Sequence, residues 1–373
     1  MAQSKKDKAA TDAKPKQARA PAKTQQSTPD TATTVHPGMG AIPHENGVAF
    51  RVWAPNASTV AVCGSFNNWD QAAHPLTSEG NGYWYGDVAE AKIGDEYRYF
   101  LNTPWGELSR IDPYAREVTN SVGNGVVHQP HFDWGDDQFQ CPPWNELVIY
   151  EMHVGTFYDP DPENNLPAGF HDITKQFGHL KKLGVNALQL MPVAEFAGDH
   201  SWGYNPAHIF AVETAYGGPK AFKEFVKQAH QNGFAVILDV VYNHFGPSDL
   251  DLWRFDGWSE NDGGGIYFFQ DDRRHTPWGA TRPDYGRGEV RQFIRDNALM
   301  WLEDYHVDGL RMDMTVYIHK HGSGAAPIQE GWSLLQWINR EIAEKFPGRI
   351  TIAEDLQQDA YVTKEEHEGG AGF

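Results

Sequence analysis

The run FAVILDVVYN at residues 234–243 constrains the fold more than any other stretch of this sequence. Its apolar residues follow one another almost without interruption, whereas a half-buried strand alternates apolar and polar residues. A strand that is covered on both faces has this composition, and such strands are typical of parallel sheets flanked by helices. The run therefore predicts a central strand of an α/β domain.

Strand-like and helix-like patterns alternate along the chain from about residue 146 onward. Strands are expected at 147–154, 186–193, 234–243, 309–314 and 350–356, and helices at 172–184, 218–233, 289–305 and 332–346. Asp172 is the expected N-cap of the first helix. The alternation predicts a parallel sheet of about five strands, either doubly wound or part of a TIM barrel.

A loop of about 45 residues separates Asn243 from Glu289, and loops of this length in compact domains are usually functional. It follows a strand, on the side of the sheet where α/β folds place their sites. Its aromatic residues are Trp253, Trp258, Tyr267, Phe268 and Trp278. They either line a groove for a ligand or pack the loop against itself.

The region before residue 135 has a different pattern. Short runs rich in β-branched and aromatic residues at 48–55, 58–66, 81–88 and 95–102 predict an all-β, immunoglobulin-like sandwich. The first residues lack any hydrophobic period and are predicted to form a disordered tail, with a basic interaction arm as the alternative. We divide the chain into a tail at 1–35, a β-sandwich module at 36–138 and a barrel region at 139–373.

Composition argues against several classes of protein. A formal net charge of −19 repels phosphate backbones, so no nucleic-acid partner is expected. No segment approaches the roughly 20 apolar residues that span a membrane, and the N-terminus lacks the apolar region of a secretory signal. We therefore expect no membrane partner and a cytoplasmic location. Cys63 and Cys141 are too few for a disulfide framework or a zinc site.

Charged residues stand near the C-terminal ends of three predicted strands. Arg311 and Asp313 share one face of their strand because side chains alternate along it. Asp239 and Glu354 occupy two of the other strands. A buried ion pair that fixes register is one interpretation. The other is cleavage of a glycosidic bond, which requires two carboxyl groups flanking a cleft, one ionised and one protonated. Arg311 would then keep Asp313 ionised.

Several short motifs resemble those of a known family. DVVYNH (239–244), DGLRMDM (308–314) and IAED (352–355), in this order, resemble the first three motifs of the α-amylase family, glycoside hydrolase family 13. The stretch 200–226 resembles the segment before the first motif in the branching-enzyme side of that family. Residues 48–70 resemble the β-sandwich module, of the carbohydrate-binding module 48 type, that precedes this barrel in branching, debranching and trehalose-releasing enzymes. The resemblance implies an α/β fold, a partial (β/α)8 barrel preceded by the sandwich.

The resemblance also implies a role for each matching residue. Asp313 would be the nucleophile, Glu354 the general acid and base, and Arg311 the group that orients the nucleophile. The candidate substrate-binding residues are Tyr204, Asp239, His244, Trp202 and Asn243. Tyr204 would stack on the sugar, His244 would bind its hydroxyls, and Asp239 would brace the site. Asn243 matches a calcium ligand of many amylases, but the branching group commonly lacks that ion, so neither metal nor cofactor is expected.

One family feature is missing from the sequence. The fourth motif carries a His-Asp pair, and no such dipeptide follows Glu354. Five strands are also too few for an eight-stranded barrel. We therefore expect a truncated chain, either a fragment or a natural truncation, with poor solubility and little or no activity by itself.

Three functions remain open on the sequence alone. The first is 1,4-α-glucan branching, in which an α-1,4 bond is cleaved and an α-1,6 bond is formed on glycogen, amylose or maltooligosaccharides. The second keeps the chemistry but uses water, as a maltooligosyl-trehalose trehalohydrolase or a debranching enzyme does. The third is a non-catalytic glucan-binding protein, with Trp53, Trp69 and Trp84 of the sandwich as candidate platforms or as core residues.

Overall fold

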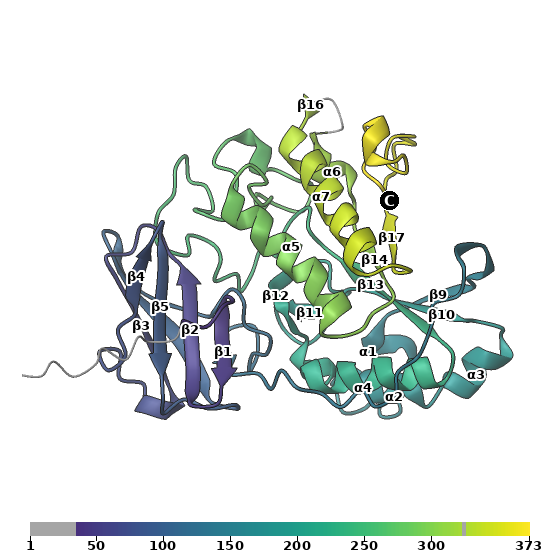
Figure 1. Cartoon of the computed structure of the whole chain (residues 1–373), viewed down its shortest axis with the longest axis horizontal. Helices are drawn as coiled ribbons and strands as arrows, with labels where there is room; N and C mark the ends of the chain where they lie inside the picture. Colours follow the sequence, from purple (N-terminus) through teal and green to yellow (C-terminus); the bar gives the residue numbers. More distant parts are fainter. Residues whose placement is uncertain (1–34, 323–325) are drawn as a thin grey trace, which may run out of the picture. The chain divides into compact units, whose positions relative to one another are not determined.

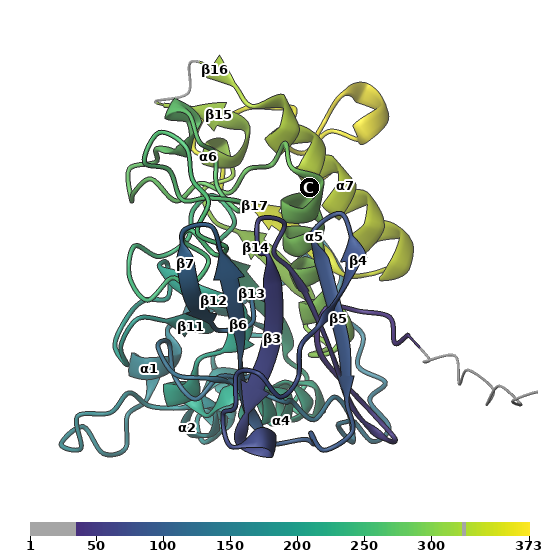
Figure 2. The same ribbon diagram turned by 90° about the vertical axis from the view of Figure 1, so that its left-hand side faces the viewer.

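Two antiparallel sheets form a sandwich in the N-terminal part of the computed structural model, which describes residues 35–322 and 326–373. One sheet has the order β1 (Gly40–His44), β2 (Gly47–Trp53), β5 (Tyr83–Val88), β4 (Thr77–Gly80). The other contains β3 (Thr59–Gly64), β6 (Glu96–Thr103) and β7 (Gly106–Arg110), with β8 (Gly125–Val126) also paired to β6. Figure 2 shows β3, β6 and β7 side by side. The all-β sandwich predicted from the strand spacing is confirmed.

Alternating burial explains why the central strands were recognisable. In β6, Tyr97, Tyr99 and Leu101 are buried, and the residues between them are more exposed. The strands β4 and β7 escaped prediction because both lie at sheet edges and consist mostly of exposed polar residues. The predicted disordered tail, residues 1–35, lies outside the described residues except for Val35.

Five parallel strands form the second sheet of the described chain, in the order β9 (Ile149–Met152), β10 (Ala187–Leu190), β13 (Ala235–Val240), β14 (Gly309–Met312), β17 (Ile350–Ala353). Within this sheet, each strand pairs with the sheet's next strand in chain order, and helices occupy the connections (Figure 1). A doubly wound sheet reverses its strand order at a switch point, whereas this order is that of a (β/α)8 barrel. The expected partial barrel is therefore present.

The connecting helices and hairpins include elements that the sequence did not reveal. The helices are α1 (Val154–Phe157), α2 (Phe170–Thr174), α3 (Phe177–Lys182), α4 (Gly218–Gln231), α5 (Gly288–Glu303), α6 (Val316–His319) and α7 (Gln329–Lys345). Two short hairpins pair β11 (Ala194–Phe196) with β12 (Pro206–Val212), and β15 (Lys320–His321) with β16 (Ala326–Pro327). No helix in the described part of the chain is both long and apolar enough to cross a bilayer.

The helix predicted at 172–184 is the clearest local error of the sequence prediction. It is split into α2 and α3, and Asp172 is not the N-cap. Gly169 precedes α2, and the Asp172 carboxylate accepts a hydrogen bond from its backbone N–H at 3.0 Å. The acid therefore stabilises the helix start from inside the first turn, where a negative charge also meets the positive end of the helix dipole.

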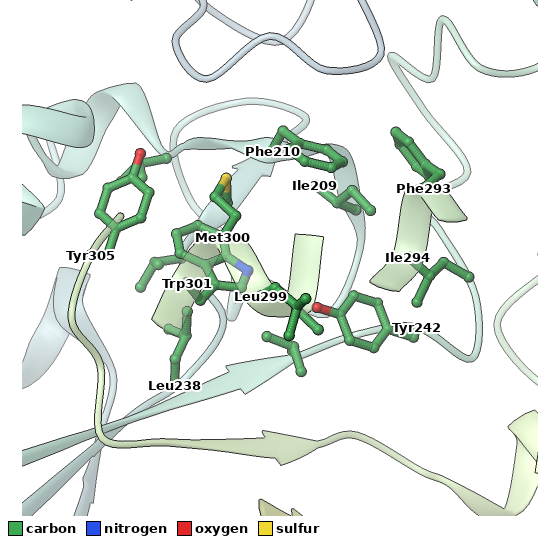
Figure 3. Packing of buried hydrophobic residues seen from close by; sticks show 14 of the residues in the cluster. Ile209, Phe210, Leu238, Tyr242, Phe293, Ile294, Leu299, Met300, Trp301 and Tyr305 are labelled. Carbon is green, nitrogen blue, oxygen red and sulfur yellow. The ribbon is translucent and has the colours of Figure 1, made fainter. Parts of the chain in front are cut away.

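In the barrel region, the core lies between the outer face of the parallel sheet and its helices, and it belongs to the same buried cluster as the interior of the sandwich. Figure 3 shows Leu238, Trp301 and Tyr242 gathered in this layer. The polar ends of the two aromatic side chains meet one buried amide, because Asn297 Oδ1 accepts hydrogen bonds from Tyr242 at 2.7 Å and from Trp301 at 3.1 Å. Bulky rings are thus buried here without leaving a donor unsatisfied.

The long loop, residues 244–287, docks on the sandwich. Asp251 accepts bonds from the Arg98 guanidinium at 2.9 Å and from the Ile111 backbone at 2.7 Å. Tyr267 meets Trp53 edge-on, with ring centroids 5.6 Å apart. Residues 37–373 accordingly form one compact unit. The loop therefore joins the two parts of the protein, in addition to any role at the end of the sheet.

Candidate active site

Asp313 stands directly after β14 and is buried at the carboxyl end of the parallel sheet. Its backbone N–H donates to Val240 at 2.9 Å, which continues the pairing with β13. The Asn243 side-chain amide donates to both the carboxylate of Asp313, at 2.9 Å, and its carbonyl, at 3.0 Å. Two neighbouring strand ends thus hold this carboxylate in place.

Arg311 contacts all three carboxylates of the group, which explains why a cation and an anion share one side of a buried strand. Its Nη1 donates to Asp239 at 2.6 Å and to Asp313 at 3.0 Å, and its Nη2 lies 2.8 Å from Glu354. Asp239 belongs to β13, Arg311 to β14, and Glu354 follows β17. One guanidinium therefore gathers three carboxylates, one from each of three adjacent strands, on the same face of the sheet.

Glu354 is anchored by the backbone of the turn after Asp313. Its Oε2 accepts from the Met314 N–H at 3.0 Å, and its carbonyl accepts from the Thr315 backbone at 3.0 Å. Met314 has a φ of +40°, a left-handed conformation that non-glycine residues seldom adopt. Such strain is often found at functional sites, and here the turn aims a backbone N–H at the acid.

Tyr204 and His244 complete the group on the β13 side. The Tyr204 hydroxyl donates to Asp239 at 2.8 Å, and His244 Nε2 lies 2.8 Å from the Tyr204 carbonyl. His244 Nδ1 lies 2.6 Å from Asn243 Oδ1. Burial lowers the pKa of His244 to about 4, so the ring is neutral at pH 7 and donates from only one of its two nitrogens.

Burial outweighs the nearby cation in setting the pKa of the acids. It raises the pKa of Asp313 to about 6, against the opposing effects of Asn243 and Arg311, and the Glu354 charge raises it further. It raises the pKa of Asp239 to about 7 despite Arg311 and Tyr204. The sequence led us to expect the opposite direction for Asp313. The carboxylate nevertheless remains mostly ionised at pH 7.

Some of the remaining predicted residues contact the acid group, and others lie away from it. Trp202 is 71% exposed, two residues before Tyr204, and so is not packed into the group. Among the loop aromatics, Trp278 stacks on His244 with centroids 4.7 Å apart and a 13° angle between planes. Tyr267 and Phe268 are buried, so they pack the loop and do not line a groove.

The candidate platforms of the sandwich also separate. Trp53 is buried, and Trp84 is half-buried with its indole N–H bonded to the Ala54 carbonyl at 3.1 Å. Trp69 is the one of these three with an exposed ring, at 39%.

The sequence missed the contributions of Met314 and Thr315, since only the tertiary fold brings their backbones to Glu354.

A sandwich that precedes a sequentially ordered parallel sheet, with three carboxylates at its carboxyl end, defines a class of carbohydrate-active protein. Residues 38–115 match carbohydrate-binding module 48, described as the isoamylase N-terminal domain, and residues 155–274 match the alpha amylase catalytic domain. The chain belongs to the α-amylase family, glycoside hydrolase family 13.

The curated relatives to which the chain is similar include 1,4-alpha-glucan branching enzymes. The chain is 36% identical to the 1,4-alpha-glucan branching enzyme GlgB of Pseudoalteromonas atlantica, over 87% of this chain and 47% of the relative. It is 35% identical to the enzyme of the same name from Rhodospirillum rubrum, over 92% of this chain and 49% of the relative. The chain spans about half the length of these curated relatives.

Solved structures agree with the fold. A crystal structure from Salmonella typhimurium assigned to the alpha amylases matches with a TM-score of 0.71 and 30% identity, over 86% of this chain and 50% of that one. A pullulanase from Paenibacillus barengoltzii matches with a TM-score of 0.71 and 23% identity, over 86% of this chain and 53% of that one. The second likeness concerns the fold alone.

Proposed function

We propose that the chain carries the nucleophile and the general acid of a retaining α-glucan enzyme of the branching type. Such an enzyme cleaves an α-1,4 bond of glycogen, amylose or a maltooligosaccharide and forms an α-1,6 bond. The observation that carries the proposal is the contact of one guanidinium, that of Arg311, with three carboxylates from adjacent strand ends. The names of the relatives support the branching reaction in particular.

The roles follow from the chemistry of two carboxyl groups. An Asp313 oxygen forms a bond to the anomeric carbon while the bond from that carbon to the glycosidic oxygen breaks, and Glu354 gives its proton to the departing oxygen. A 6-hydroxyl oxygen then attacks the same carbon and displaces Asp313, and Glu354 takes the hydroxyl proton. Two displacements at one carbon retain its configuration.

The hydrogen bonds of Glu354 indicate which oxygen carries the proton. Oε2 faces the Arg311 guanidinium and accepts the Met314 N–H, so it is held as an acceptor. Oε1 is the oxygen left for the proton in this arrangement. Arg311 orients both reacting carboxyl groups, because its two terminal nitrogens contact Asp313 and Glu354 separately.

The same proposal assigns the two parts of the chain. Residues 36–138 are a glucan-binding module, and residues 139–373 are the N-terminal part of a catalytic barrel. Tyr204 supplies a stacking face beside Asp239. A hydrogen bond from His244 to a sugar hydroxyl would replace one of its present contacts, to the Tyr204 carbonyl or to Asn243 Oδ1. Because the chain spans about half the length of its relatives, the reaction is proposed for the enzyme to which these residues belong.

The test incubates amylose with the 373-residue chain and, in parallel, with the full product of its gene. Iodine staining, reducing ends and α-1,6 linkages are followed together. Falling iodine absorbance and new α-1,6 linkages without new reducing ends are expected. Asp313→Asn is the matched inactive control. An active protein that produces only reducing ends would contradict branching.

Trehalose release is the second candidate, and it rests on sequence. The runs AVETAYGGP (211–219) and DVVYNHFGP (239–247) fit the trehalose-releasing members of the family nearly as well as the branching ones. Maltooligosyl-trehalose is therefore included as a substrate, and free trehalose would decide for this reaction. Retention on glycogen without any product from either protein would support the third possibility, a non-catalytic glucan-binding protein.

A further inference from the structure

Glu354 is the one acid of the group whose strand lies at an edge of the parallel sheet. In the part of the chain that the structure describes, β17 pairs with β14 and with no other strand. Asp239 lies on β13 and Asp313 follows β14, and each of these strands has a neighbour on both sides. Strand pairing therefore fixes Glu354 from one side only, so contacts beyond the end of β17 decide how firmly this acid is held.

A buried contact between a histidine and a carboxylate lies directly after Glu354. His319 Nε2 lies 3.0 Å from Asp355 Oδ2, and the two side chains are only 3% and 5% exposed. His319 is the last residue of α6, and its ring meets Trp332 of α7 edge-on, with centroids 4.9 Å apart. The imidazole is therefore packed in one orientation, with Nε2 directed at Asp355.

Thr315 connects this contact to the backbone of Glu354. Its hydroxyl donates to the Glu354 carbonyl at 3.0 Å and lies 3.4 Å from Asp355 Oδ2, and its backbone N–H donates to the same carbonyl at 3.0 Å. The other Asp355 oxygen accepts from the Gln357 backbone at 3.1 Å. The peptide that joins residues 354 and 355 is thus held both by its carbonyl and by the side chain that follows it.

The contact does not require His319 to be charged. Burial lowers the pKa of this histidine, and Asp355 opposes that effect. A neutral ring keeps its hydrogen on Nε2, because the atom that faces Nε2 is a carboxylate oxygen and can only accept, and a protonated ring carries that hydrogen as well. The imidazole therefore donates to Asp355 in both protonation states.

We propose that His319 is a positioning residue, which acts through Asp355 to fix where Glu354 presents its proton. The role of Glu354 as the acid rests on the proposed function, whereas the hold on its backbone does not. Glu354 Oε2 is held by the Met314 N–H at 3.0 Å and by Arg311 at 2.8 Å. A shift of the backbone at 354–355 would loosen these contacts and move the protonated oxygen away from the glycosidic oxygen. A misplacement of about 1 Å can lower a rate about a hundredfold.

The leaving group distinguishes a misplaced acid from general damage to the site. Glu354 must protonate the departing oxygen of maltoheptaose, whereas fluoride departs from α-maltotriosyl fluoride with the electron pair of the C–F bond and needs no proton. In the full product of the gene, His319→Ala should lower kcat for maltoheptaose about a hundredfold. It should lower fluoride release in the first turnover less than about threefold, because this step does not use the acid. Equal losses on the two donors overturn the proposal.

Three further variants separate the contact from the fold. His319→Gln is the matched rescue, because its amide nitrogen can replace Nε2 as the donor to Asp355, and it should recover most of the rate. Asp355→Ala removes the other partner without burying a charge, so it tests the contact even if His319→Ala does not fold. The double variant should be no slower than the slower single variant, since the two side chains act as a unit; additive losses contradict this. His367→Ala, at an exposed histidine, is the control.

Hydrogen exchange tests the hold on Glu354 in the folded 373-residue chain without any turnover. The Met314 N–H donates to Glu354 Oε2, so its exchange rate reports whether this acid stays in place. His319→Ala should speed exchange at Met314 about tenfold and leave the Asp313 N–H, which donates to Val240, at the parent rate. Parent-like exchange at Met314 overturns the positioning role. Turnover by Asp313→Asn would instead refute the proposed function and leave the exchange result standing, so the two proposals fail independently.

Discussion

Two charged clusters lie at opposite ends of the parallel sheet, and their charges are balanced differently. The upper cluster, at the carboxyl ends of the strands, joins one cation, Arg311, to Asp239, Asp313 and Glu354. The lower cluster, at the amino ends, joins His230 and Arg349 to Asp137 and Asp308. The upper cluster has three acids for one cation, whereas the two acids of the lower cluster face Arg349 and two histidines, His230 and His306.

The lower cluster is built as a structural clamp. His230 Nδ1 lies 2.8 Å from Asp137 and Nε2 lies 2.9 Å from Asp308, and Asp308 also contacts Arg349. Burial alone would lower the pKa of His230, but the bonds to Asp308 and Asp137 raise it. Asp137 belongs to the segment that links the sandwich to β9, so the clamp ties this linker to the base of the barrel.

The difference in charge balance predicts that the lower cluster serves stability and the upper cluster serves catalysis. Balanced charges satisfy one another, and the amino ends of barrel strands generally serve stability. Excess buried negative charge is unfavourable for folding and raises the pKa of the acids, and the carboxyl ends are where barrels place catalysis. The comparison therefore predicts that changes in the upper cluster alter activity more than stability, and that changes in the lower cluster do the reverse.

The largest expected effect is that of Asp313→Asn on turnover. With the proposed nucleophile removed, the proposed branching of amylose should fall at least about a thousandfold, which is about 4 kcal/mol in the barrier. The free energy of unfolding should change by less than about 1 kcal/mol, since the lost hydrogen bond is offset by removal of a buried charge. Amylose assays and urea unfolding check the two values.

Equal turnover by Asp313→Asn would remove the upper cluster from the reaction. A loss of stability comparable to the loss in barrier would instead show that the two clusters are alike. Asp159→Asn provides the control, because this half-buried carboxylate lies outside both clusters and accepts a bond from the Asp161 backbone.

The second prediction concerns His230→Ala in the lower cluster. It leaves Asp137 and Asp308 without their shared cation, and breaking a buried ion network in this way costs about 3 kcal/mol. Urea unfolding should show this loss, while kcat of the protein that remains folded stays near that of the parent. His179→Ala, in the exposed part of α3, is the matched control. A stable His230→Ala protein would contradict the clamp.

The sequence predicted the five strands because each is an apolar run between helical patterns, and FAVILDVVYN is the clearest case. It placed Arg311 and Asp313 on one face because strand alternation is strictly periodic. It could not predict that burial outweighs Arg311 at Asp313, since that depends on how closely neighbouring strand ends pack. It could not predict either that Trp53 and Trp258 line one pocket, because only the tertiary fold brings these residues together.

The third prediction compares how the clusters respond to pH. The folded pKa values of Asp313 and Asp239, about 6 and about 7, lie above the ordinary 3.8. The folded state therefore binds more protons between these values, and the free energy of unfolding falls as pH rises from 4 to 7. His230 has the same sign at higher pH, since its contribution is complete below 6.5 and is lost as pH rises through its raised folded pKa.

Urea unfolding between pH 4 and 8.5 distinguishes the pH range in which the upper cluster loses stability from the range in which His230 does. Asp313→Asn should flatten the decline between pH 4 and 6 by on the order of 2 kcal/mol, and His230→Gln should flatten the part above pH 6.5. Glu195 and Glu213 also have raised pKa values because of burial, but they are unchanged in both variants, so differences from the parent cancel them. Parallel curves for parent and both variants would show that neither cluster titrates as described.

The smallest expected effect is that of Tyr204→Phe, which tests the protonation state of Asp239 in the upper cluster. The ring stays and only the hydroxyl that donates to Asp239 at 2.8 Å is lost. At pH 8 Asp239 is ionised and buried, so losing a donor should lower the free energy of unfolding by about 1 kcal/mol. At pH 5 Asp239 carries its own proton and the loss should be smaller. Tyr158→Phe, at an exposed ring, is the control. If Tyr204→Phe were equally destabilising at both pH values, Asp239 would not change its protonation state between pH 5 and pH 8.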